Sequence, residues 1–346
     1  MDGLPNCITS IDYKPALSIN VSALDASCTA NTGRIAITAA GGSGAYDYQV
    51  NGTTIVGNAL AGLAAGTYTV SVYDKNDVNC FHSQTVRVGK EICAPVTSCV
   101  KINAFVYLEG AHRPGGIMHT DLNDKGYLPG QKPNAFFGTP TIAGQPYNRA
   151  PWSYNGTEGA GFNYQLTGNN KAGYDPNVVD WVLVSLRSGT AKSTTVCRHA
   201  ALLHKDGSIH FVAGHDCCQV DPHKSYYIVV EHRNHLIIMS PTPVPVSNGT
   251  LTYDFRFTDS YKSLFGVGQK KLPSGVYAMY CGNGDQTSSG SSDTNITTDD
   301  KNQWVRDNGS NSAYFYPDFD MNGDVNVTDK SVWLDNNGKA CDVPNN

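Results

Sequence analysis

The sequence predicts a mainly β protein: an Ig-like β-sandwich, a second and larger β-sandwich, and a small C-terminal unit of loops and helices. Three observations predict this class. Runs that alternate apolar and polar residues, separated by Gly, Asn and Pro turns, recur from residue 17 to residue 274. Charged residues make up only 16%, whereas Gly and Tyr reach 35 and 19, a profile unlike that of a helical cytosolic enzyme. Residues 275–346 instead repeat a short acidic pattern.

Length and charge limit the function classes. A chain of 346 residues suggests two or three domains, each able to bury a core. The net charge of −5 is mild and no Lys/Arg cluster could follow a phosphate backbone, so nucleic acid is not an expected partner. No apolar run approaches the ~18 residues of a membrane span. The start, MDGLPNC, lacks an apolar segment, which predicts that any signal peptide has been removed.

Cysteines and glycosylation triplets predict export. The ten cysteines are even in number and include no CxxC pair, so we expect an oxidising, extracellular compartment and up to five disulfides. The Asn-x-Ser/Thr triplets that would suit a secreted glycoprotein begin at Asn20, Asn51, Asn155, Asn248, Asn295, Asn308 and Asn326.

The first module is expected at residues 17–90. Its runs LSINVSAL, RIAITA, YDYQVNG, TYTVSVYD and TVRV predict a small Ig-like sandwich. Cys28 opens the second run and Cys80 follows the TVSVYD run, so both are candidates for a disulfide joining the two sheets. Residues 1–16 have no place in this sandwich, and a strand there could be donated to the open sheet edge of a neighbouring copy.

Two phrases of this module resemble a known family. SCTANTGRIAITAAGGSGAYDYQV and LAGLAAGTYTVSVYDKNDVNC resemble the SprB-type repeat of gliding adhesins, a module found on Bacteroidota surface proteins. The resemblance implies an Ig-like spacer or adhesive module and supplies no catalytic residues.

A hinge and the largest module follow. Residues 91–99 hold Cys93 and Cys99 around a proline, which predicts a stapled hinge onto which Cys7 could also close. Across residues 100–274, the runs KINAFVYLEG, VVDWVLVSLR, AALLHKDGSIHFV, SYYIVVEHRNHLIIM and TLTYDFRF predict the larger β-sandwich, with a long loop from 112 to 177. These runs resemble an uncharacterised module of large secreted Bacteroidota proteins, which is often placed before calcium-binding repeats.

The C-terminus contains an internal duplication. A shift of 29 residues aligns ITTDDKNQWVRDNG (296–309) with VNVTDKSVWLDNNG (325–338). In the second copy, DFDMNGDVNVTD (318–329) matches a 12-residue calcium loop, with Gly323 at the sharp turn. Its expected oxygen ligands are Asp318, Asp320, Asn322, the Asp324 carbonyl, Asn326 through water, and Asp329. The alternative is a solvated Asn/Asp-rich turn.

An aspartate at the twelfth position, followed by a short helix with a tryptophan, resembles the dockerin-type repeat. That resemblance implies Ca²⁺ as the cofactor and docking to a protein partner. The first copy carries an insertion, and by analogy its ligands would be Asn283, Asp285, Asp293 and Asp300, with the carbonyl of Ile296. Cys281 and Cys341 bracket the unit and are candidates for a disulfide that ties its ends together.

Enzyme chemistry has weaker support. Histidines between 199 and 235, beside Cys197, Cys217 and Cys218, offer an alternative zinc or copper site. His232 and His235 lie three apart in an expected strand, so we expect them on opposite faces. Only one vicinal cysteine can bond Cys197, which predicts that the other is free or bonded to another chain. A hydrolase in residues 100–274 would need paired carboxylates, for which the candidates are Glu109, Glu158 and Asp180, although Asp180 is better explained as a structural carboxylate.

These observations predict a secreted, non-catalytic structural or adhesive protein of the bacterial surface or extracellular matrix, stabilised by calcium and able to self-assemble into filaments. The alternative is a binding module that docks a surface protein or a glycan. The aromatic residues expected to stack on sugar rings are Phe136, Phe137, Tyr147, Trp152 and Tyr154.

Overall fold

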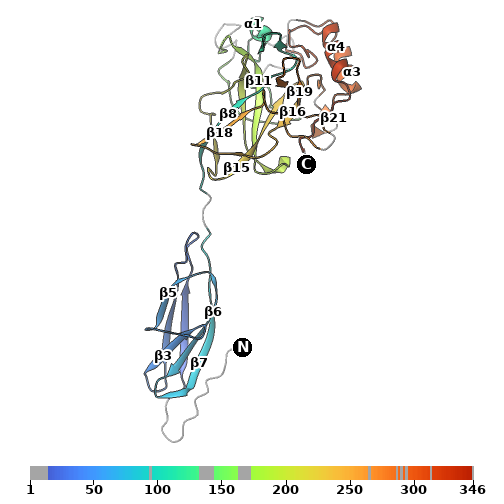
Figure 1. Ribbon diagram of the computed structural model, residues 1–346. Helices are drawn as coiled ribbons and strands as arrows, with labels where there is room; N and C mark the ends of the chain where they lie inside the picture. Colours follow the sequence, from blue (N-terminus) through green and yellow to red (C-terminus); the bar gives the residue numbers. More distant parts are fainter. Residues whose placement is uncertain are drawn as a thin grey trace. The chain divides into compact units, whose positions relative to one another are not determined.

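The structure, a computed structural model, describes residues 15–92, 96–131, 144–162, 173–263, 266–285, 287–288, 291–292, 295–311 and 314–344. The chain divides into two compact units, Met1–Pro95 and Val96–Asn346 (Figure 1). The boundary falls within the predicted hinge. Most of the predicted N-terminal segment lies outside the described residues. Each helix that the structure describes is too short or too polar to cross a lipid bilayer.

The first unit is a sandwich of two antiparallel sheets. One has the order β1-β2-β5 and the other β4-β3-β6-β7. The strands are β1 Ser18–Leu24, β2 Gly33–Ala40, β3 Tyr46–Val50, β4 Thr53–Ile55, β5 Ala59–Leu63, β6 Gly66–Asp74 and β7 Asp77–Val88. Alternate residues of β2 and β6 point inward, and Ile35, Ile37, Val70 and Val72 form the core. The predicted period-two pattern therefore places one apolar face of each sheet inside.

The second unit packs a six-stranded sheet and a three-stranded sheet around one core. The large sheet has the order β13-β12-β11-β15-β16, with β17 paired to β15, and the small sheet has the order β14-β8-β18. Every residue of β11 is buried, as expected for a continuous apolar run covered on both faces. β18 runs parallel to β8. The strands are β8 Ser98–Phe105, β11 Val178–Arg187, β12 Thr195–His204, β13 Ile209–Phe211, β14 Cys218–Val220, β15 Ser225–His232, β16 His235–Met239, β17 Val244–Pro245 and β18 Thr250–Asp254.

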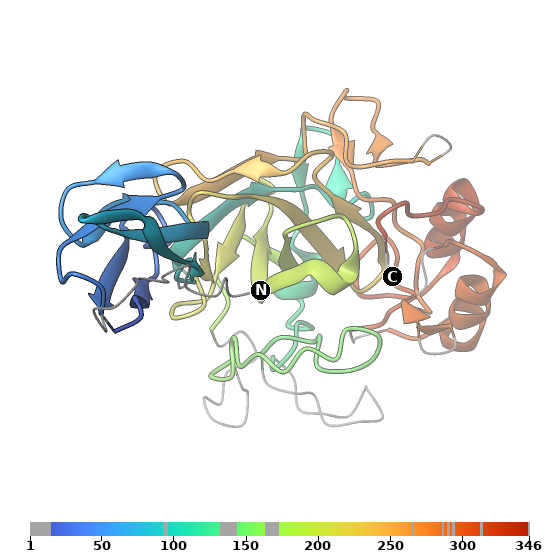
Figure 2. The same ribbon diagram turned by 90° about the horizontal axis from the view of Figure 1, so that it is seen from below.

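Short elements surround these sheets. They are β9 His112–Arg113, β10 Ile117–Met118, α1 Asp121–Asp124, the 3₁₀ turn η1 Lys192–Thr194, β19 Lys270–Lys271, β20 Tyr277–Ala278, β21 Thr287–Ser288, β22 Ser291–Ser292, α3 Thr298–Asp307 and α4 Val327–Asn336. The segment from β19 onward packs along one side of the large sheet (Figure 2). Leu236 of β16 shares a small core there with Ile296, Phe319 and Trp333. The mainly β class with few short helices is confirmed.

The expected single strand through residues 225–239 is wrong. Arg233 and Asn234 turn the chain between β15 and β16, so His232 and His235 are cross-strand partners. Their Nδ1 atoms lie 2.9 Å apart instead of on opposite faces. The alternation of side chains between the two faces ends at a hairpin turn. No Gly or Pro marks this turn in the sequence, so a prediction that continues the alternation across it is wrong.

The disulfides differ from the predicted ones. Only one of the two vicinal cysteines can bond Cys197, and Cys218 does so. Cys217 bonds Cys99 instead. Cys217 is therefore neither free nor available to another chain, and Cys99 does not staple the hinge. Cys217 directly precedes β14, and the pairing of β14 with β8 brings its Cα to 5.3 Å from that of Cys99. Both Cys28 and Cys80 are disulfide-bonded, although the described disulfides do not include the predicted bond between them; Cys7 and Cys93 lie outside the described residues.

Candidate calcium centre

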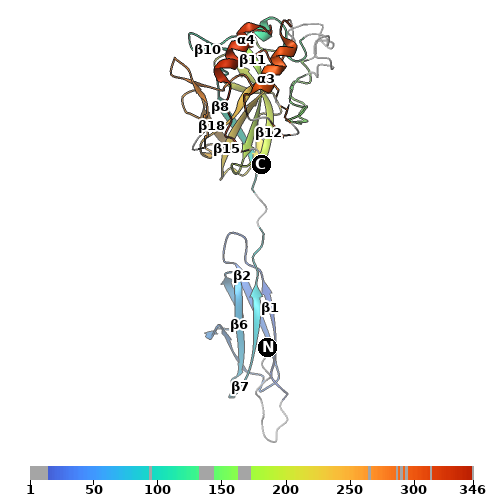
Figure 3. The same cartoon turned by 90° about the vertical axis from the view of Figure 1, so that its right-hand side faces the viewer.

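The duplicated sequence forms two equivalent helices, α3 and α4, whose bounds differ by the same shift of 29 residues. Each begins with a capping box. In α3 the pair is Thr297 and Asp300, and in α4 it is Asn326 and Asp329. Figure 3 shows the two helices side by side. The internal repeat predicted from the sequence is therefore a structural repeat as well.

The two copies hold each other through reciprocal contacts. The Trp304 indole donates to the carbonyl of Asn326 at 2.7 Å, and the Trp333 indole donates to the carbonyl of Thr297 at 2.8 Å. Each tryptophan thus bonds the residue that caps the other helix. Backbone bonds repeat the symmetry, because Gly338 donates to Ile296 and Gly309 donates to Val325, both at 2.8 Å. The two copies within this chain are therefore related by approximate twofold symmetry.

Three carboxylates of the predicted calcium loop converge. One oxygen from each of Asp318, Asp320 and Asp329 lies within 4.8 Å of the others. The side chains of Asp318 and Asp329 are fully buried, and that of Asp320 is partly buried. Because like charges in a dry site repel one another, such a cluster needs either protons or a cation.

Backbone amides shape the loop around these carboxylates. Asp318 accepts from the amides of Asn322 at 3.0 Å and Gly323 at 2.8 Å. Asp329 accepts from Asp320 at 3.0 Å and from Asn326 at 2.8 Å, which ties the loop to the start of α4. Gly323, at the predicted turn position, has φ +89°, a left-handed conformation that glycine adopts at little cost.

The electrostatics favour a bound cation. Burial raises the pKa of Asp318 well above its usual value, with further increases from Asp329 and Asp320 and a partial opposing effect of Arg233. Burial, with the Asp320 charge, raises the pKa of Asp329 to about 6. Both shifts mean that the charged carboxylates are disfavoured until positive charge is supplied.

The donor set fits Ca²⁺. Hard Ca²⁺ prefers six to eight oxygen ligands, and the loop offers carboxylate oxygens together with the Asn322 side chain and the Asp324 carbonyl. Asn322 is held in place because its side-chain oxygen accepts from the Asp324 amide at 2.8 Å. No nitrogen or sulfur donor of a described residue is part of this cluster. Of the predicted ligands, the carboxylates of Asp318, Asp320 and Asp329 are brought together. The roles of Asn322, the Asp324 carbonyl and Asn326 stay predictions.

Distant segments of the same unit anchor the loop. Asn234, in the β15–β16 turn, donates to the carbonyl of Asp318 at 2.8 Å, and His119 donates to the carbonyl of Asp320 at 3.0 Å. Lys125 donates to the Asn322 carbonyl and lies 3.3 Å from the Asp324 carboxylate. A Cβ on Gly110 would lie 1.9 Å from the Phe319 carbonyl. No spacing in the sequence points to these anchors, because each depends on packing between distant segments.

The first copy keeps the framework of a loop. The Asp300 side chain accepts from the amides of Gly284 at 2.7 Å, Asp285 at 3.1 Å and Thr297 at 2.7 Å. Asp300 therefore takes the place that Asp329 has in the second copy, and its bonds to the amides of Gly284 and Asp285 hold the start of the first loop beside it. Asp293 lies outside the described residues. A calcium ion in this loop stays a prediction.

Cys281 and Cys341 are both free thiols, so the predicted disulfide across the unit is wrong. The reason is that they lie in different surroundings. The Cys281 thiol is buried near Glu109 and Asn336, whereas the Cys341 sulfur accepts from the amide of Val343 at 3.2 Å. Packing of the unit against the large sheet stabilises its ends instead.

Two of the aromatic residues expected to bind a glycan belong to the core. Tyr147 and Trp152 are buried, and Tyr147 donates to the carbonyl of Trp181 at 2.7 Å, so neither ring is free to stack on a sugar. Tyr154 donates to Glu158. Phe136 and Phe137 lie outside the described residues.

The three candidate hydrolase carboxylates also have other partners. Asp180 is buried in β11, where it forms an ion pair with Arg233 and a hydrogen bond with His232, which supports the structural interpretation. Glu109 accepts from Lys270 and from the Cys281 amide. Glu158 contacts two histidines, His199 and His215.

Comparisons with known proteins give distant structural similarity. No family model matches the chain, and no curated protein matches its sequence. Among solved structures, the chain is similar to a C-terminal interface mutant of a type II Cohesin-X-Dockerin complex from Acetivibrio cellulolyticus. Identity is 9%, the TM-score is 0.33, and the match covers 70% of this chain and 97% of that one. The N-terminal interface mutant of the same complex type matches at 14% identity and TM-score 0.28, over 46% of this chain and 81% of that one. The resemblances to adhesin and dockerin repeats therefore stay predictions.

Proposed function

We propose that this chain is a secreted, non-catalytic structural protein of the bacterial surface or extracellular matrix, and that Ca²⁺ in the loop 318–329 stabilises it. The observation that carries the proposal is the convergence of Asp318, Asp320 and Asp329 in an all-oxygen, largely buried loop. A cation there removes the repulsion between the carboxylates and cross-links the loop to α4.

The position of the loop makes this effect larger than a local one. The carbonyls of Asp318 and Asp320 are held by Asn234 and His119, so the ordered loop is continuous with the turn of the large sheet and with the segment before α1. Calcium binding therefore stabilises the second unit as a whole, because ligand that binds only the folded state adds to its stability.

Extracellular calcium would keep the site filled. Loops of this kind work at Kd of roughly 10⁻⁴–10⁻³ M in extracellular modules, and the disulfides Cys99–Cys217 and Cys197–Cys218 suit an oxidising compartment. A permanently filled site contributes rigidity to the module and does not act as a sensor.

Protein docking is a second candidate. Val305 of α3 and Leu334 of α4 occupy equivalent positions in the repeat, and both are exposed. Exposed apolar side chains at matched positions on two adjacent helices suit a protein partner. Self-association through residues 1–16 would add to either function, and negative-stain microscopy that shows only monomers at high concentration would contradict it.

The test uses Asp320→Asn, with Asp335→Asn as the control on the exposed face of α4. Without calcium, Asp320→Asn should melt at the same temperature as wild type or higher, because a repelling charge is gone. With calcium, it should gain less stability than wild type and bind the ion at least tenfold more weakly. Calorimetric calcium titration and thermal melts with and without EDTA give both readouts. Equal calcium responses of wild type and Asp320→Asn, or no calcium in elemental analysis, would refute the site.

A further inference from the structure

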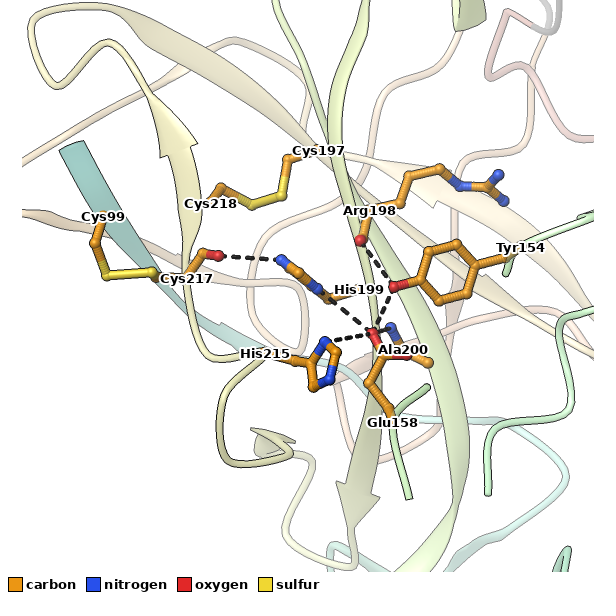
Figure 4. Close-up of a disulfide and its surroundings, with 10 residues drawn as sticks. All are labelled: Cys99, Tyr154, Glu158, Cys197, Arg198, His199, Ala200, His215, Cys217 and Cys218. Atoms are coloured by element: carbon orange, nitrogen blue, oxygen red, sulfur yellow. Dashed lines mark hydrogen bonds and ion pairs between the residues drawn. A yellow bond between two sulfur atoms is a disulfide. The ribbon is translucent and has the colours of Figure 1, made fainter. Parts of the chain in front are cut away.

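Three potential metal ligands converge at a second place, far in the sequence from the calcium loop. Glu158 lies in the long loop before β11, His199 lies on β12, and His215 lies in the connection from β13 to β14. Figure 4 shows both imidazoles directed at the Glu158 carboxylate. One ligand atom from each residue lies within 4.8 Å of the others. The fold thus brings together a His₂Glu set that is dispersed in the sequence.

The spacing fits a tetrahedral ion better than direct hydrogen bonds. Glu158 Oε1 lies 3.4 Å from His199 Nδ1 and 3.5 Å from His215 Nδ1. Hydrogen bonds between nitrogen and oxygen usually measure about 2.7–3.2 Å. Two ligands of a tetrahedral zinc ion, each about 2.0–2.1 Å from the metal, are about 3.3–3.4 Å apart. The two measured distances are close to that edge length.

The orientation of His199 also suits a metal ligand. Its Nε2 lies 3.0 Å from the carbonyl of Cys217, and a carbonyl can only accept, so Nε2 carries a proton. In the neutral ring, Nδ1 then presents a lone pair to the Glu158 carboxylate, which also only accepts. A cation between these two acceptors resolves the conflict, either a proton on Nδ1 or a metal ion. Metal-bound histidines commonly donate their other N–H to a carbonyl in this way.

The carboxylate itself is buried and incompletely satisfied. The Glu158 side chain has no exposed surface, and its Oε2 has no hydrogen-bond partner among the described residues. Its Oε1 accepts from the Tyr154 hydroxyl at 2.5 Å and from the Ala200 amide at 3.2 Å. The two histidines beside Glu158 carry a positive charge only when they are protonated. A buried carboxylate in this state is costly unless a positive charge lies beside it.

We propose that Glu158, His199 and His215 bind a zinc ion and leave its fourth position open to solvent. The two histidine side chains are 19% and 30% exposed, so an ion can enter and a water or an outside ligand can complete the tetrahedron. Nitrogen donors select zinc over calcium. Cys197 and Cys218 lie close to His199, but their sulfurs are bonded to each other and do not bind the ion. This site is independent of the calcium proposal.

Bound zinc would cross-link three segments. It would join the loop before β11, strand β12 and the segment that leads to Cys217, which is bonded to Cys99 of β8. Three protein ligands with one open position are also the arrangement found in sites where zinc binds an exchangeable water or ligand. The class of ligand that this position accepts is a carboxylate, an imidazole or water.

The test is metal binding by the full chain with its disulfides intact. We expect one zinc ion per chain by isothermal titration, and visible absorption bands typical of tetrahedral cobalt when Co²⁺ is added instead. His215→Ala, at the most exposed ligand, and Glu158→Gln should each weaken zinc binding at least tenfold. His223→Ala, an exposed histidine in the turn before β15, should bind zinc like wild type, and Asp320→Asn should lose calcium but keep zinc.

Three results would overturn the proposal. They are no saturable zinc binding, equal affinity in His215→Ala and wild type, or the same loss in His223→Ala, which would show non-specific surface binding. If Glu158→Gln fails to fold, His215→Ala decides the question, because its side chain lies at the surface and its removal leaves the core intact.

Discussion

Replacing Asp180 by asparagine tests how the C-terminal segment is joined to the large sheet. Asp180 Oδ1 accepts from the Tyr314 hydroxyl at 2.6 Å, and Oδ2 lies 3.0 Å from Arg233 Nε and 3.1 Å from His232 Nε2. Its side chain is fully buried and that of Arg233 is 1% exposed. Arg233 also holds the carbonyl of Phe315. One carboxylate thus neutralises a buried arginine that reaches the segment before the calcium loop.

The loss of stability expected for Asp180→Asn follows from this burial. Asparagine keeps the shape but removes the charge, so Arg233 is left buried without its partner, which costs about 3–5 kcal/mol. The second unit, Val96–Asn346, contains 346 − 96 + 1 = 251 residues, and at this size 1 kcal/mol shifts Tm by about 2–4 °C. We therefore expect Asp180→Asn to lower the Tm of this unit by about 6–20 °C.

Differential scanning calorimetry in excess calcium measures this shift. The control is Asp216→Asn, which breaks the exposed pair with Lys101 and should cost no more than about 1 kcal/mol. Adding Arg233→Met to Asp180→Asn should restore part of the loss, because the unpaired charge is removed. If Asp180→Asn shifts Tm no more than Asp216→Asn does, the reasoning is refuted.

Three further predictions concern the same unit. Gly110→Ala should cost about 1–3 kcal/mol and weaken calcium binding, since its Cβ would meet the Phe319 carbonyl; Gly161→Ala, which meets nothing within 4 Å, is the control in the same calcium titration. By loop entropy, removing Cys99–Cys217 (separation 118) should cost about 5 kcal/mol and removing Cys197–Cys218 (separation 21) about 3 kcal/mol; chemical denaturation of paired serine variants tests the order, and a reversed order contradicts it. The pKa of Asp329 is raised to about 6, so its protonated form stabilises the calcium-free fold below pH ~4 and this stabilisation is lost as pH rises through about 6. Calcium requires the carboxylate, so its apparent affinity should fall as pH drops through 6, and titrations with equal affinity at pH 7.5 and 5 would contradict the assignment.

Local patterns predicted the strands and the repeat well. The period-two runs of the first unit predict strands with one buried face, and the continuous apolar run VVDWVLVSLR of β11 predicts a strand buried on both faces. Each pattern lies within a single run of residues. The calcium ligands Asp318, Asp320 and Asp329 could be proposed because a 12-residue loop carries its ligands in one continuous segment. The shift of 29 residues predicted the equivalence of α3 and α4.

The errors share one physical cause. The pairing of Cys99 with Cys217, the His232–His235 contact and the free state of Cys281 and Cys341 depend on which strands become neighbours. That choice is made by the summed packing of many distant side chains, and no local spacing reports it.

The sequence by itself therefore determined the mainly β class, the internal repeat and the oxygen-rich loop, because each is encoded in short continuous segments. Only the tertiary structure decided how the loop is held, with Asn234 and His119 on its carbonyls, and which dispersed residues meet at Glu158. Those contacts join segments up to about two hundred residues apart, and their geometry exists only once both sheets have packed around a shared core.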